Sequence, residues 1–308
     1  MSTPTLQRST PSPRVSPWLL LGRVSNLPTV WSNTLTGIAL ASAAQAATGL
    51  PSTPPTSMHV LGLAGALSLL YVGGMYLNDA FDRDFDAKHR PERPIPSGTV
   101  SARAVFSVGF AMLALGIAVS AFSGWTRTGS LSAGGAAVAL AALVVVYNLH
   151  HKGNPASPVI MGLCRVFVYV TAALATFNAY SPALALASVA LLGYLIGLTY
   201  IAKHETGGSI VRFWPLLPLA FPVLYGLAAE GLAPKALALV VLVHTALTLR
   251  YVLSPAQRNV PKAVGQLIAG ISLVDAVAIA ATGLPELALL AIAAFSLTRI
   301  FQRVVPGT

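Results

Sequence analysis

Residues 58–86, MHVLGLAGALSLLYVGGMYLNDAFDRDFD, join a long apolar run to a cluster of aspartates. From Met58 to Leu77 the run contains no Asp, Glu, Lys or Arg. About 20 mostly apolar residues is the length of a helix that crosses a bilayer. The carboxylates begin directly after this run, so the stretch predicts a membrane-spanning helix that ends at a strongly charged segment.

Apolar runs of this kind recur along the whole chain. Of the 308 residues, 55% are hydrophobic and 9% are charged, whereas about a quarter of the residues in a soluble domain are charged. We therefore predict an all-α membrane protein with about nine transmembrane helices and a tenth, C-terminal helix that spans the bilayer or lies at its interface. The predicted segments are 24–47, 58–80, 102–123, 131–149, 158–178, 182–202, 211–229, 234–253, 262–282 and 285–303.

The N-terminal segment differs in composition from everything that follows. Residues 1–17 are rich in Ser, Thr and Pro and contain two Arg and no acid. Such a segment cannot bury enough apolar surface to fold alone, and no short apolar run with a cleavage site follows it. We predict a disordered cytoplasmic tail over 1–17 and a single helical transmembrane domain over 18–308.

The basic residues predict an orientation. If all ten segments cross, 17 of the 19 Lys and Arg fall on one side, and only Arg127 and Lys235 fall on the other. Loops rich in Lys and Arg stay in the cytoplasm, so both termini and the aspartate segment should be cytoplasmic, in an inner membrane. The basic residues are scattered between apolar runs and form no nucleic-acid-binding face. No obligate protein partner is evident.

The aspartates have a helical spacing. Asp79, Asp82 and Asp86 occupy an arc of about 60° on a continuous helix, and Asp84 lies nearly opposite. Carboxylates on one face repel one another and are costly to desolvate. Mg²⁺ prefers carboxylate oxygens and often bridges to substrate phosphates, so the three predict a magnesium site. The alternative is that the acids solvate a loop and pair with neighbouring basic residues.

The same residues resemble a known family. Residues 78–86, NDAFDRDFD, are similar to the first motif, N-D-x-x-D-x-x-x-D, of the UbiA superfamily of intramembrane prenyltransferases. Residues 90–98, RPERPIPSG, resemble the segment that follows this motif in the family. The resemblance implies a helical bundle around a central cavity, and Mg²⁺-dependent transfer of a prenyl group from an isoprenoid diphosphate to an aromatic or other small acceptor within the membrane.

The resemblance also implies roles for individual residues. The catalytic metal ligands would be Asp79, Asp82 and Asp86. Residues 147–154, YNLHHKGN, resemble a family segment that approaches the diphosphate. The predicted substrate-binding residues are Asn78, Arg93, Tyr147, Lys152, Lys203 and Glu205. Four aromatic residues are candidates to stabilise an allylic cation, with ordinary packing as the alternative: Tyr71, Tyr76, Phe81 and Tyr147.

One family feature is incomplete. In the family, a second acidic motif follows the sixth span. Here the corresponding residues 200–208, YIAKHETGG, contain a single acidic residue, Glu205. Either His204 replaces a carboxylate, or fewer ions bind, or diphosphate ionisation has been lost; Glu205 could also pair locally with a basic residue. The pattern resembles the EboC-like branch of the superfamily. It leaves open a non-catalytic membrane carrier or binding protein for an isoprenoid or similar metabolite, and an unrelated transporter.

A few polar or reactive residues lie inside apolar segments. Arg165 is costly to place in lipid and is expected to point into a cavity. His244 and Asp275 lie in the middle of their predicted spans, where an ionisable side chain is a candidate for a functional site. The alternative for each is a structural hydrogen bond between helices. Cys164 is the sole cysteine, which excludes a disulfide framework and predicts a packed, inert thiol. The adjacent pair at 150–151, two histidines, indicates a polar interface more than a metal site.

Overall fold

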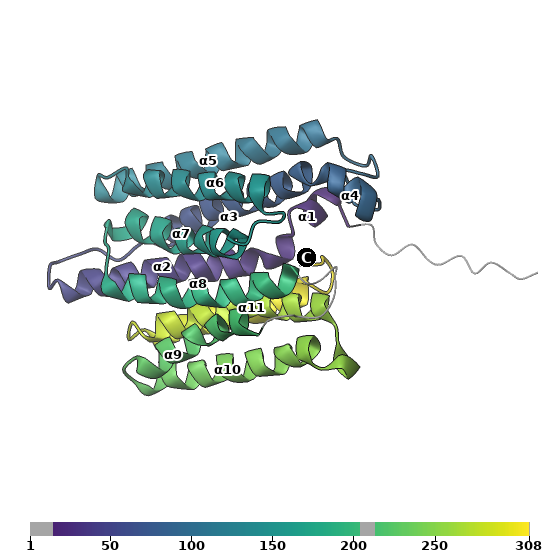
Figure 1. Ribbon diagram of the computed structural model, residues 1–308. Helices are drawn as coiled ribbons and strands as arrows, with labels where there is room; N and C mark the ends of the chain where they lie inside the picture. The colour runs from purple at the N-terminus through teal and green to yellow at the C-terminus, as the bar shows by residue number, and fades with distance from the viewer. Residues whose placement is uncertain (1–14, 204–212, 308) are drawn as a thin grey trace, which may run out of the picture.

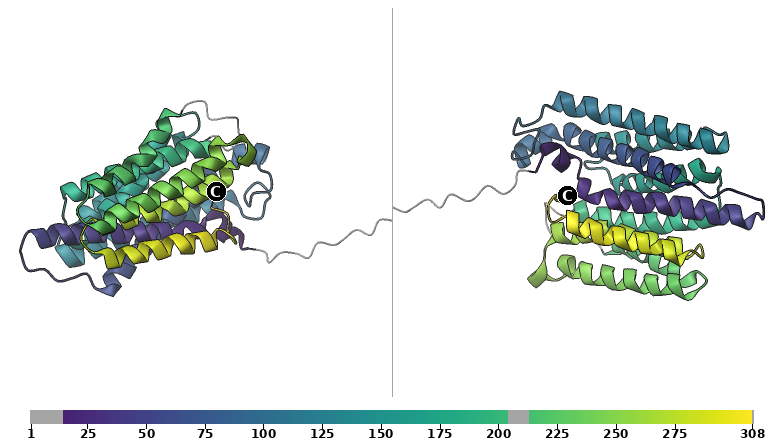
Figure 2. Two further views of the ribbon diagram at one scale, coloured as in Figure 1. Left: turned by 90° about the horizontal axis from the view of Figure 1, so that it is seen from below. Right: turned by 180° about the vertical axis from the view of Figure 1, so that it is seen from behind.

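The computed structural model describes residues 15–203 and 213–307, and within these ranges the chain is helical with no strand (Figure 1). The long helices run side by side along one common direction (Figure 2). Their bounds, with 3-10 helices marked η, are α1 Pro17–Leu21, η1 Val24–Asn26, α2 Leu27–Ala47, α3 Ser57–Phe81, α4 Arg83–His89, α5 Ala102–Thr128, α6 Ser132–His150, α7 Ser157–Phe177, α8 Pro182–Lys203, η2 Trp214–Ala220, α9 Phe221–Ala228, α10 Leu232–Leu253, η3 Pro255–Gln257, α11 Val260–Ala280 and α12 Pro285–Phe301.

The all-α membrane fold is confirmed. Within the described residues, seven helices are long and apolar enough to cross a membrane, namely α3, α5, α6, α7, α8, α10 and α11. The other three predicted segments also contain helix, but α2, the η2–α9 pair and α12 are not among those seven. The count of nine spans therefore stays a prediction.

The segment predicted at 211–229 is not one continuous α-helix, which corrects the sequence interpretation. Its described part consists of the 3-10 helix η2 followed by the short helix α9. Pro215, Pro218 and Pro222 all lie in this stretch. A proline lacks the backbone N–H and clashes with the preceding turn, so the repeated prolines prevent a regular α-helix here.

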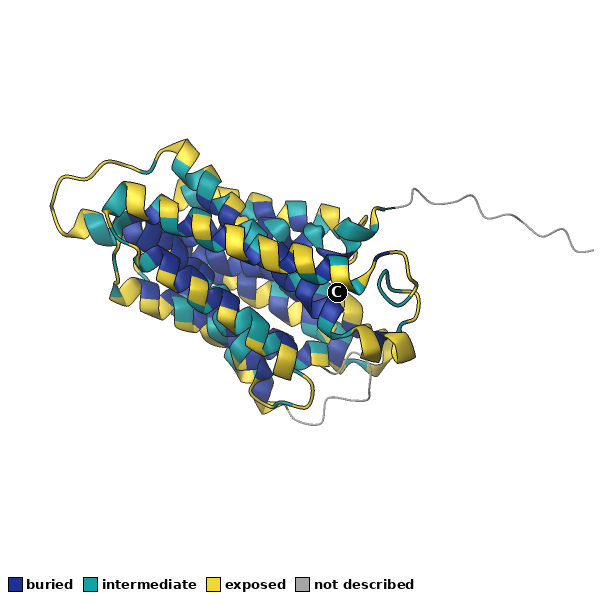
Figure 3. Ribbon diagram, turned by 90° about the horizontal axis from the view of Figure 1, so that it is seen from above, coloured by how far each residue is buried: buried dark blue, intermediate teal, exposed yellow. Residues whose placement is uncertain are grey.

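Helix α2 lies in the interior and joins two apolar cores. One core lies among α2, α3, α5, α6 and α7, and another among α2, α7, α8, α9, α10 and α11. Buried residues face inward between the helices, whereas the outer faces are largely exposed (Figure 3). Apolar outer faces fit a lipid environment, in which lipid tails replace water.

Close packing of α2 against α7 depends on one glycine. A Cβ atom at Gly37 would press into the backbone carbonyl oxygen of Tyr169 and lie 2.8 Å from the Cβ of Ala172. Helices in membranes approach closely where small residues let the two backbones meet. Gly37 therefore sets the distance between α2 and α7.

The order of the helices gathers several chain segments at one end of the bundle. The end of α3, helix α4 and the C-terminal residues lie at the same end as the beginning of α1 (Figures 1 and 2). The predicted tail reaches as far as Pro17, where α1 begins; its residues 1–14 lie outside the described part of the chain. The charged motif is therefore close in space to both ends of the described chain.

Candidate functional site

A cavity of about 760 Å³ opens near this end of the bundle. Its deeper walls are mostly apolar side chains, and its mouth is charged. The apolar wall includes Val30, Leu67, Leu70, Leu140, Val144, Val168, Leu195 and Ile271. The charged and polar lining includes Arg23, Asn26, Asn78, Asp82, Asp86, Arg90, Arg93, Asn148, His151, Lys152, Arg165 and Lys203.

The aspartate motif lies where α3 passes into α4. Asp82 ends α3, and its carbonyl oxygen accepts a hydrogen bond from the backbone N–H of Asp86 at 2.8 Å, which continues the helical turn. Asp79 and Asp86 are buried, while the side chain of Asp84 is 86% exposed and lies 3.6 Å from Arg83. The local backbone thus directs three of the four carboxylates inward and Asp84 outward.

Arg93 connects two of these carboxylates. Its Nη1 lies 3.3 Å from Oδ1 of Asp79 and 2.9 Å from Oδ2 of Asp86. All three side chains are largely buried, so the charges are poorly screened by solvent. Arg93 therefore brings the first and last aspartates of the motif to one point at the cavity mouth.

Asp82 faces a second basic group, from the loop after α6. Nζ of Lys152 lies 2.5 Å from its Oδ1, and Nε2 of His151 lies 3.4 Å from its Oδ2. Burial raises the pKa of the Asp82 carboxyl, but the hydrogen bonds and charges of His151 and Lys152 outweigh burial and hold that pKa below its ordinary value. Asp82 is thereby kept as a carboxylate.

The structure adds Arg23, which sequence reasoning missed. Its Nη2 lies 3.3 Å from Oδ1 of Asp79 and 3.4 Å from Oδ1 of Asn78. The backbone of Arg23 has φ 42°, the left-handed region that costs a non-glycine residue about 1–3 kcal/mol. Its sequence signal was weak, because an arginine before the first span also fits the charge asymmetry of the loops.

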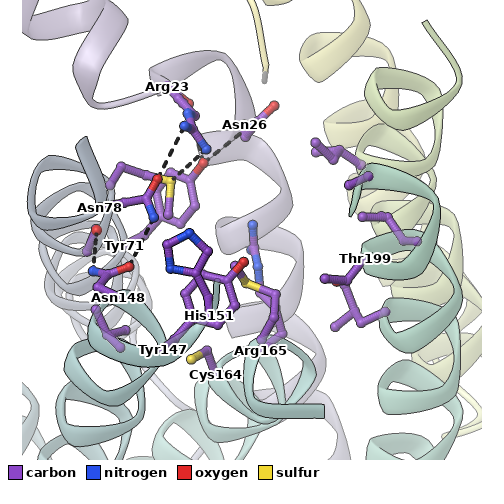
Figure 4. Close-up of a pocket in the computed structure, with 18 of the residues that line it drawn as sticks. Arg23, Asn26, Tyr71, Asn78, Tyr147, Asn148, His151, Cys164, Arg165 and Thr199 are labelled. Atoms are coloured by element: carbon purple, nitrogen blue, oxygen red, sulfur yellow. Dashed lines mark hydrogen bonds between the residues drawn. The ribbon is translucent and has the colours of Figure 1, made fainter. Parts of the chain in front are cut away.

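Two asparagines tie α3 to α6 beside the motif. Nδ2 of Asn78 donates to Oδ1 of Asn148 at 3.2 Å, and Nδ2 of Asn148 donates to the carbonyl oxygen of Gly74 at 3.2 Å (Figure 4). The ring of Tyr147 stacks on His151 with centroids 5.1 Å apart. These contacts fix the segment that carries Lys152 against the end of α3.

Lys203 and Glu205 complete the predicted set. Lys203 lines the cavity, and its Nζ donates to the carbonyl oxygen of Asn154 at 2.7 Å. Glu205 and His204 lie outside the described residues. Of the nine predicted site residues, seven line the cavity or contact its charged mouth from described positions on α3, α4 and α6 and in the segments that follow these three helices, and Lys203 joins them from α8.

Two of the four aromatic candidates were wrong. Tyr71 and Tyr147 line the cavity, but Tyr76 packs on Trp18 and donates its hydroxyl hydrogen to that residue's carbonyl oxygen at 3.2 Å. Phe81 packs edge-on against Phe106 instead. These two side chains leave α3 on the side away from the cavity, because the charged residues of the motif occupy the inward side.

The polar and reactive residues predicted inside the apolar segments lie in different surroundings in the structure. Nε2 of His244 pairs with the carbonyl oxygen of Gln266 at 3.1 Å, an interhelical hydrogen bond. Asp275 is fully buried in a hydrogen-bonded network on α11. Cys164 is a buried thiol on the cavity wall, and Arg165 beside it also lines the cavity. His150 is exposed, whereas His151 reaches the site.

The donor chemistry at the cavity mouth fits Mg²⁺. Within residues 15–203 and 213–307, no three His, Cys, Asp or Glu side chains form a ready group of ligands. Mg²⁺ does not require one, because it is usually held by one or two carboxylates together with water and substrate phosphates. The carboxylates of Asp79, Asp82 and Asp86 supply hard oxygen donors beside an open cavity.

Comparison with known proteins gives matching relatives. The model of the family described as UbiA prenyltransferase family matches residues 35–268. A digeranylgeranylglyceryl phosphate synthase of Methanoregula boonei is 38% identical over 96 residues, which are 31% of this chain and 32% of the relative. The matched segments span about a third of the length of the curated relatives.

Solved structures share the fold. A structure of digeranylgeranylglyceryl phosphate synthase in membranes has a TM-score of 0.60 at 19% identity, covering 86% of this chain and 97% of that one. A UbiA homologue from Archaeoglobus fulgidus, bound to DMAPP and Mg²⁺, has a TM-score of 0.59 at 18% identity, covering 91% and 99%. At these identities the likeness concerns the arrangement of the helices.

Proposed function

Because the chain belongs to the UbiA prenyltransferase family, we propose that it transfers a prenyl group from an isoprenoid diphosphate to a small acceptor inside the membrane. The observation that carries this proposal is one cavity with a charged mouth and apolar deeper walls. A prenyl diphosphate has the same division, with an anionic head and a hydrocarbon chain. The head would bind at the mouth and the chain along the apolar wall.

The cations at the mouth have a role in the reaction. When the bond between the prenyl C1 and the diphosphate oxygen breaks, the electron pair leaves with the diphosphate. Arg23, Arg93 and Lys152 would stabilise the negative charge that develops on the leaving group. The acceptor atom then supplies an electron pair to C1 and loses its proton to water or to the diphosphate.

Mg²⁺ would be the cofactor at this mouth. Asp79, Asp82 and Asp86 would hold it together with diphosphate oxygens, and when bound it neutralises the phosphate charge. The Archaeoglobus fulgidus homologue binds Mg²⁺ with its allylic diphosphate, which supports the assignment. The basic partners of the three aspartates would then turn from the carboxylates toward the phosphate oxygens.

Two aromatic rings face the cavity where an allylic cation would form. Tyr71 and Tyr147 lie on neighbouring helices, α3 and α6, and both line the cavity. The faces of aromatic rings attract cations. We assign these two tyrosines the stabilisation of positive charge on the prenyl group, in place of the four candidates taken from the sequence.

The proposed location is the inner membrane, with the charged mouth on the cytoplasmic side. The apolar exterior supports the membrane location, and the distribution of Lys and Arg between the two ends supports the orientation. Lipid is then a partner of the outer faces. The diphosphate would enter from the cytoplasm and the prenyl chain would lie within the bilayer.

The deciding experiment is turnover by the purified protein. The protein in micelles is incubated with Mg²⁺, allylic diphosphates of several lengths and a cell extract, and products are identified by mass spectrometry. A prenylated product that is lost in EDTA and in Asp82→Asn supports the proposal. Tight diphosphate binding without any product would instead favour the carrier, for which the single acid at Glu205 is the motivating observation.

A further inference from the structure

Four basic side chains gather where α10, α11 and α12 meet, at the end of the bundle that carries the C-terminal residues (Figure 1). This basic cluster consists of Arg250 in the last turn of α10, Lys262 in the first turn of α11, Arg299 in the last turn of α12 and Arg303 just beyond it. Helix α11 packs against both α10 and α12, so the three helix ends are neighbours. None of the four residues lines the cavity, and the basic cluster is therefore distinct from the charged mouth.

One tyrosine connects three of these cations. Nζ of Lys262 lies 4.2 Å from the centroid of the Tyr251 ring. The hydroxyl of the same tyrosine also experiences the charges of Arg250 and Arg299, and Arg303 in turn repels Arg299. The four like charges thus lie within electrostatic range of one another around a single aromatic side chain at the end of α10.

No carboxylate balances the basic cluster. Over residues 232–307 the only acidic residues are Asp275, which is buried within α11, and Glu286, which lies at the beginning of α12 and so at the other end of the bundle. In the described part of the chain, none of the four basic residues forms an ion pair. Like charges that converge repel one another, so an anion that binds among them relieves this repulsion.

Two ordinary explanations account for only part of the basic cluster. The helix dipole stabilises a cation in the last turn of a helix, which explains Arg250 and Arg299. Lys262 lies in the first turn of α11, where the same dipole disfavours a cation. Orientation in the membrane depends on the number of basic residues on each side, and does not require that they converge on one tyrosine. The convergence is therefore the feature that needs a bound anion.

The surface beside the basic cluster is apolar and faces outward. On α10, Leu247 lies one turn before Tyr251 and is 46% exposed; on α12, Ile300 follows Arg299 and is 53% exposed. Side chains one turn apart lie on the same face of a helix, so Leu247 lies below Tyr251 on the side of the bilayer centre. A free phosphate ion would leave these apolar side chains uncovered, whereas the acyl chains of a lipid would cover them.

We propose that the basic cluster binds the phosphate of an anionic phospholipid, whose acyl chains lie along the outer faces of α10 and α12. Arg250, Lys262 and Arg299 donate charge-assisted hydrogen bonds to the phosphate oxygens. Tyr251 is a positioning residue, because its ring holds the ammonium group of Lys262. An unbalanced set of cations favours an anionic headgroup over a zwitterionic one. The inference is independent of the proposed prenyl transfer, since the basic cluster lies outside the cavity.

Lipid titration followed by native mass spectrometry tests the proposal. The delipidated protein in neutral detergent micelles is titrated with phosphatidylglycerol and, separately, with phosphatidylcholine that has the same acyl chains. The wild type should bind its first phosphatidylglycerol at least about tenfold more tightly than its first phosphatidylcholine, because only the former carries a net negative charge. Inorganic phosphate at the same concentration should not displace the bound phosphatidylglycerol, because it lacks the acyl chains.

Two double variants with the same change in charge locate the site. Lys262→Gln combined with Arg299→Gln should weaken binding of phosphatidylglycerol by at least about tenfold, as expected for two lost charge-assisted hydrogen bonds. The matched control, Lys88→Gln combined with Arg103→Gln, removes two exposed cations from α4 and α5 at the same end of the bundle. Its affinity should stay within about threefold of the wild type.

A second pair of substitutions decides the matter if the first does not fold. Arg250→Gln combined with Lys262→Gln changes two exposed side chains, and it should give the same loss of affinity. Lys262→Arg, which keeps the charge, should retain the preference for phosphatidylglycerol.

Three results would contradict the lipid site. Equal affinities of the wild type for the two lipids would show that the basic cluster only contributes to orientation in the membrane. The same loss of affinity in the cluster variants and in the control would show a general effect of charge. Displacement of the lipid by an equal concentration of inorganic phosphate would assign the site to a soluble anion. Each of the three would overturn the inference and leave the proposed prenyl transfer untouched.

Discussion

Nζ of Lys152 lies 2.5 Å from Oδ1 of Asp82, so that the loop after α6 is bound to the end of α3 at the mouth of the cavity. The lysine also lies 4.1 Å from the centroid of the Phe85 ring. Lys152 could bind a phosphate and Asp82 could bind Mg²⁺. In this structure the two charged groups neutralise each other instead. Binding of a metal–diphosphate complex would exchange this ion pair for contacts with the metal and the phosphates.

The motif provides an internal control for its own carboxylates. Asp82→Asn should weaken Mg²⁺-dependent binding of a diphosphate analogue by at least about 30-fold, because a metal ligand on a charged substrate contributes several kcal/mol. Asp84→Asn should leave the affinity within about threefold, because its side chain is 86% exposed and faces away from the cavity. Calorimetric titration measures both. Equal affinities in the two variants would end the metal-site interpretation.

Lys152 is expected to contact the diphosphate. Lys152→Met should reduce the affinity for a diphosphate analogue by about tenfold, as expected for a lost charge-assisted hydrogen bond. The matched control is Lys88→Met, since Lys88 is exposed on α4 and does not line the cavity. The same titration at two salt concentrations tests the electrostatic origin. An unchanged affinity in Lys152→Met would leave this lysine as a partner of Asp82 alone.

Gly37 is expected to be required for stability. Gly37→Ala places a methyl group against the backbone of Tyr169, and overpacking of this kind costs about 1–3 kcal/mol. Gly62→Ala is the control, because nothing lies within 4 Å of a Cβ at that position of α3. Thermal unfolding in micelles should show a lower transition temperature for Gly37→Ala only. A fall of the same size in both variants would contradict the close approach of α2 and α7.

The orientation can be tested by labelling in intact cells. In a Cys164→Ala background, Thr53→Cys should react with a membrane-impermeant thiol reagent, and Ala87→Cys should react only after the cells are opened. Both positions are exposed and lie at opposite ends of the bundle. The prediction follows from the excess of Lys and Arg at the end that carries α4. The reverse pattern would place the motif outside the cytoplasm.

A variant of Glu205 can distinguish an enzyme from a protein that only binds the diphosphate. If the loop after α8 contributes to the site, Glu205→Gln should retain diphosphate binding while turnover falls by at least about tenfold, because one charge that stabilises the transition state is lost. Glu230→Gln is the control, since Glu230 lies at the turn between α9 and α10, at the opposite end of the bundle. Product formation is measured by mass spectrometry. Turnover equal to the wild type would remove Glu205 from the site.

The sequence by itself determined the helical membrane fold and the position of the charged motif. Runs of about 20 apolar residues are sufficient to predict spans, because the bilayer sets their length. The spacing of Asp79, Asp82 and Asp86 within one short segment also depends only on the local backbone, and the structure keeps Asp84 apart from them. These features arise from residues that are neighbours in the chain.

The tertiary structure alone decided which distant side chains meet. Arg23, His151 and the link from Asp275 through Asn33 to Arg165 depend on how each helix is rotated against its neighbours. That rotation is set by packing, such as the contact of Gly37 with α7, and not by local hydrophobicity. When a helix is apolar on nearly all of its faces, the spacing of its hydrophobic residues does not show which face points into the bundle. The partners of a buried charge therefore cannot be found from spacing along the chain.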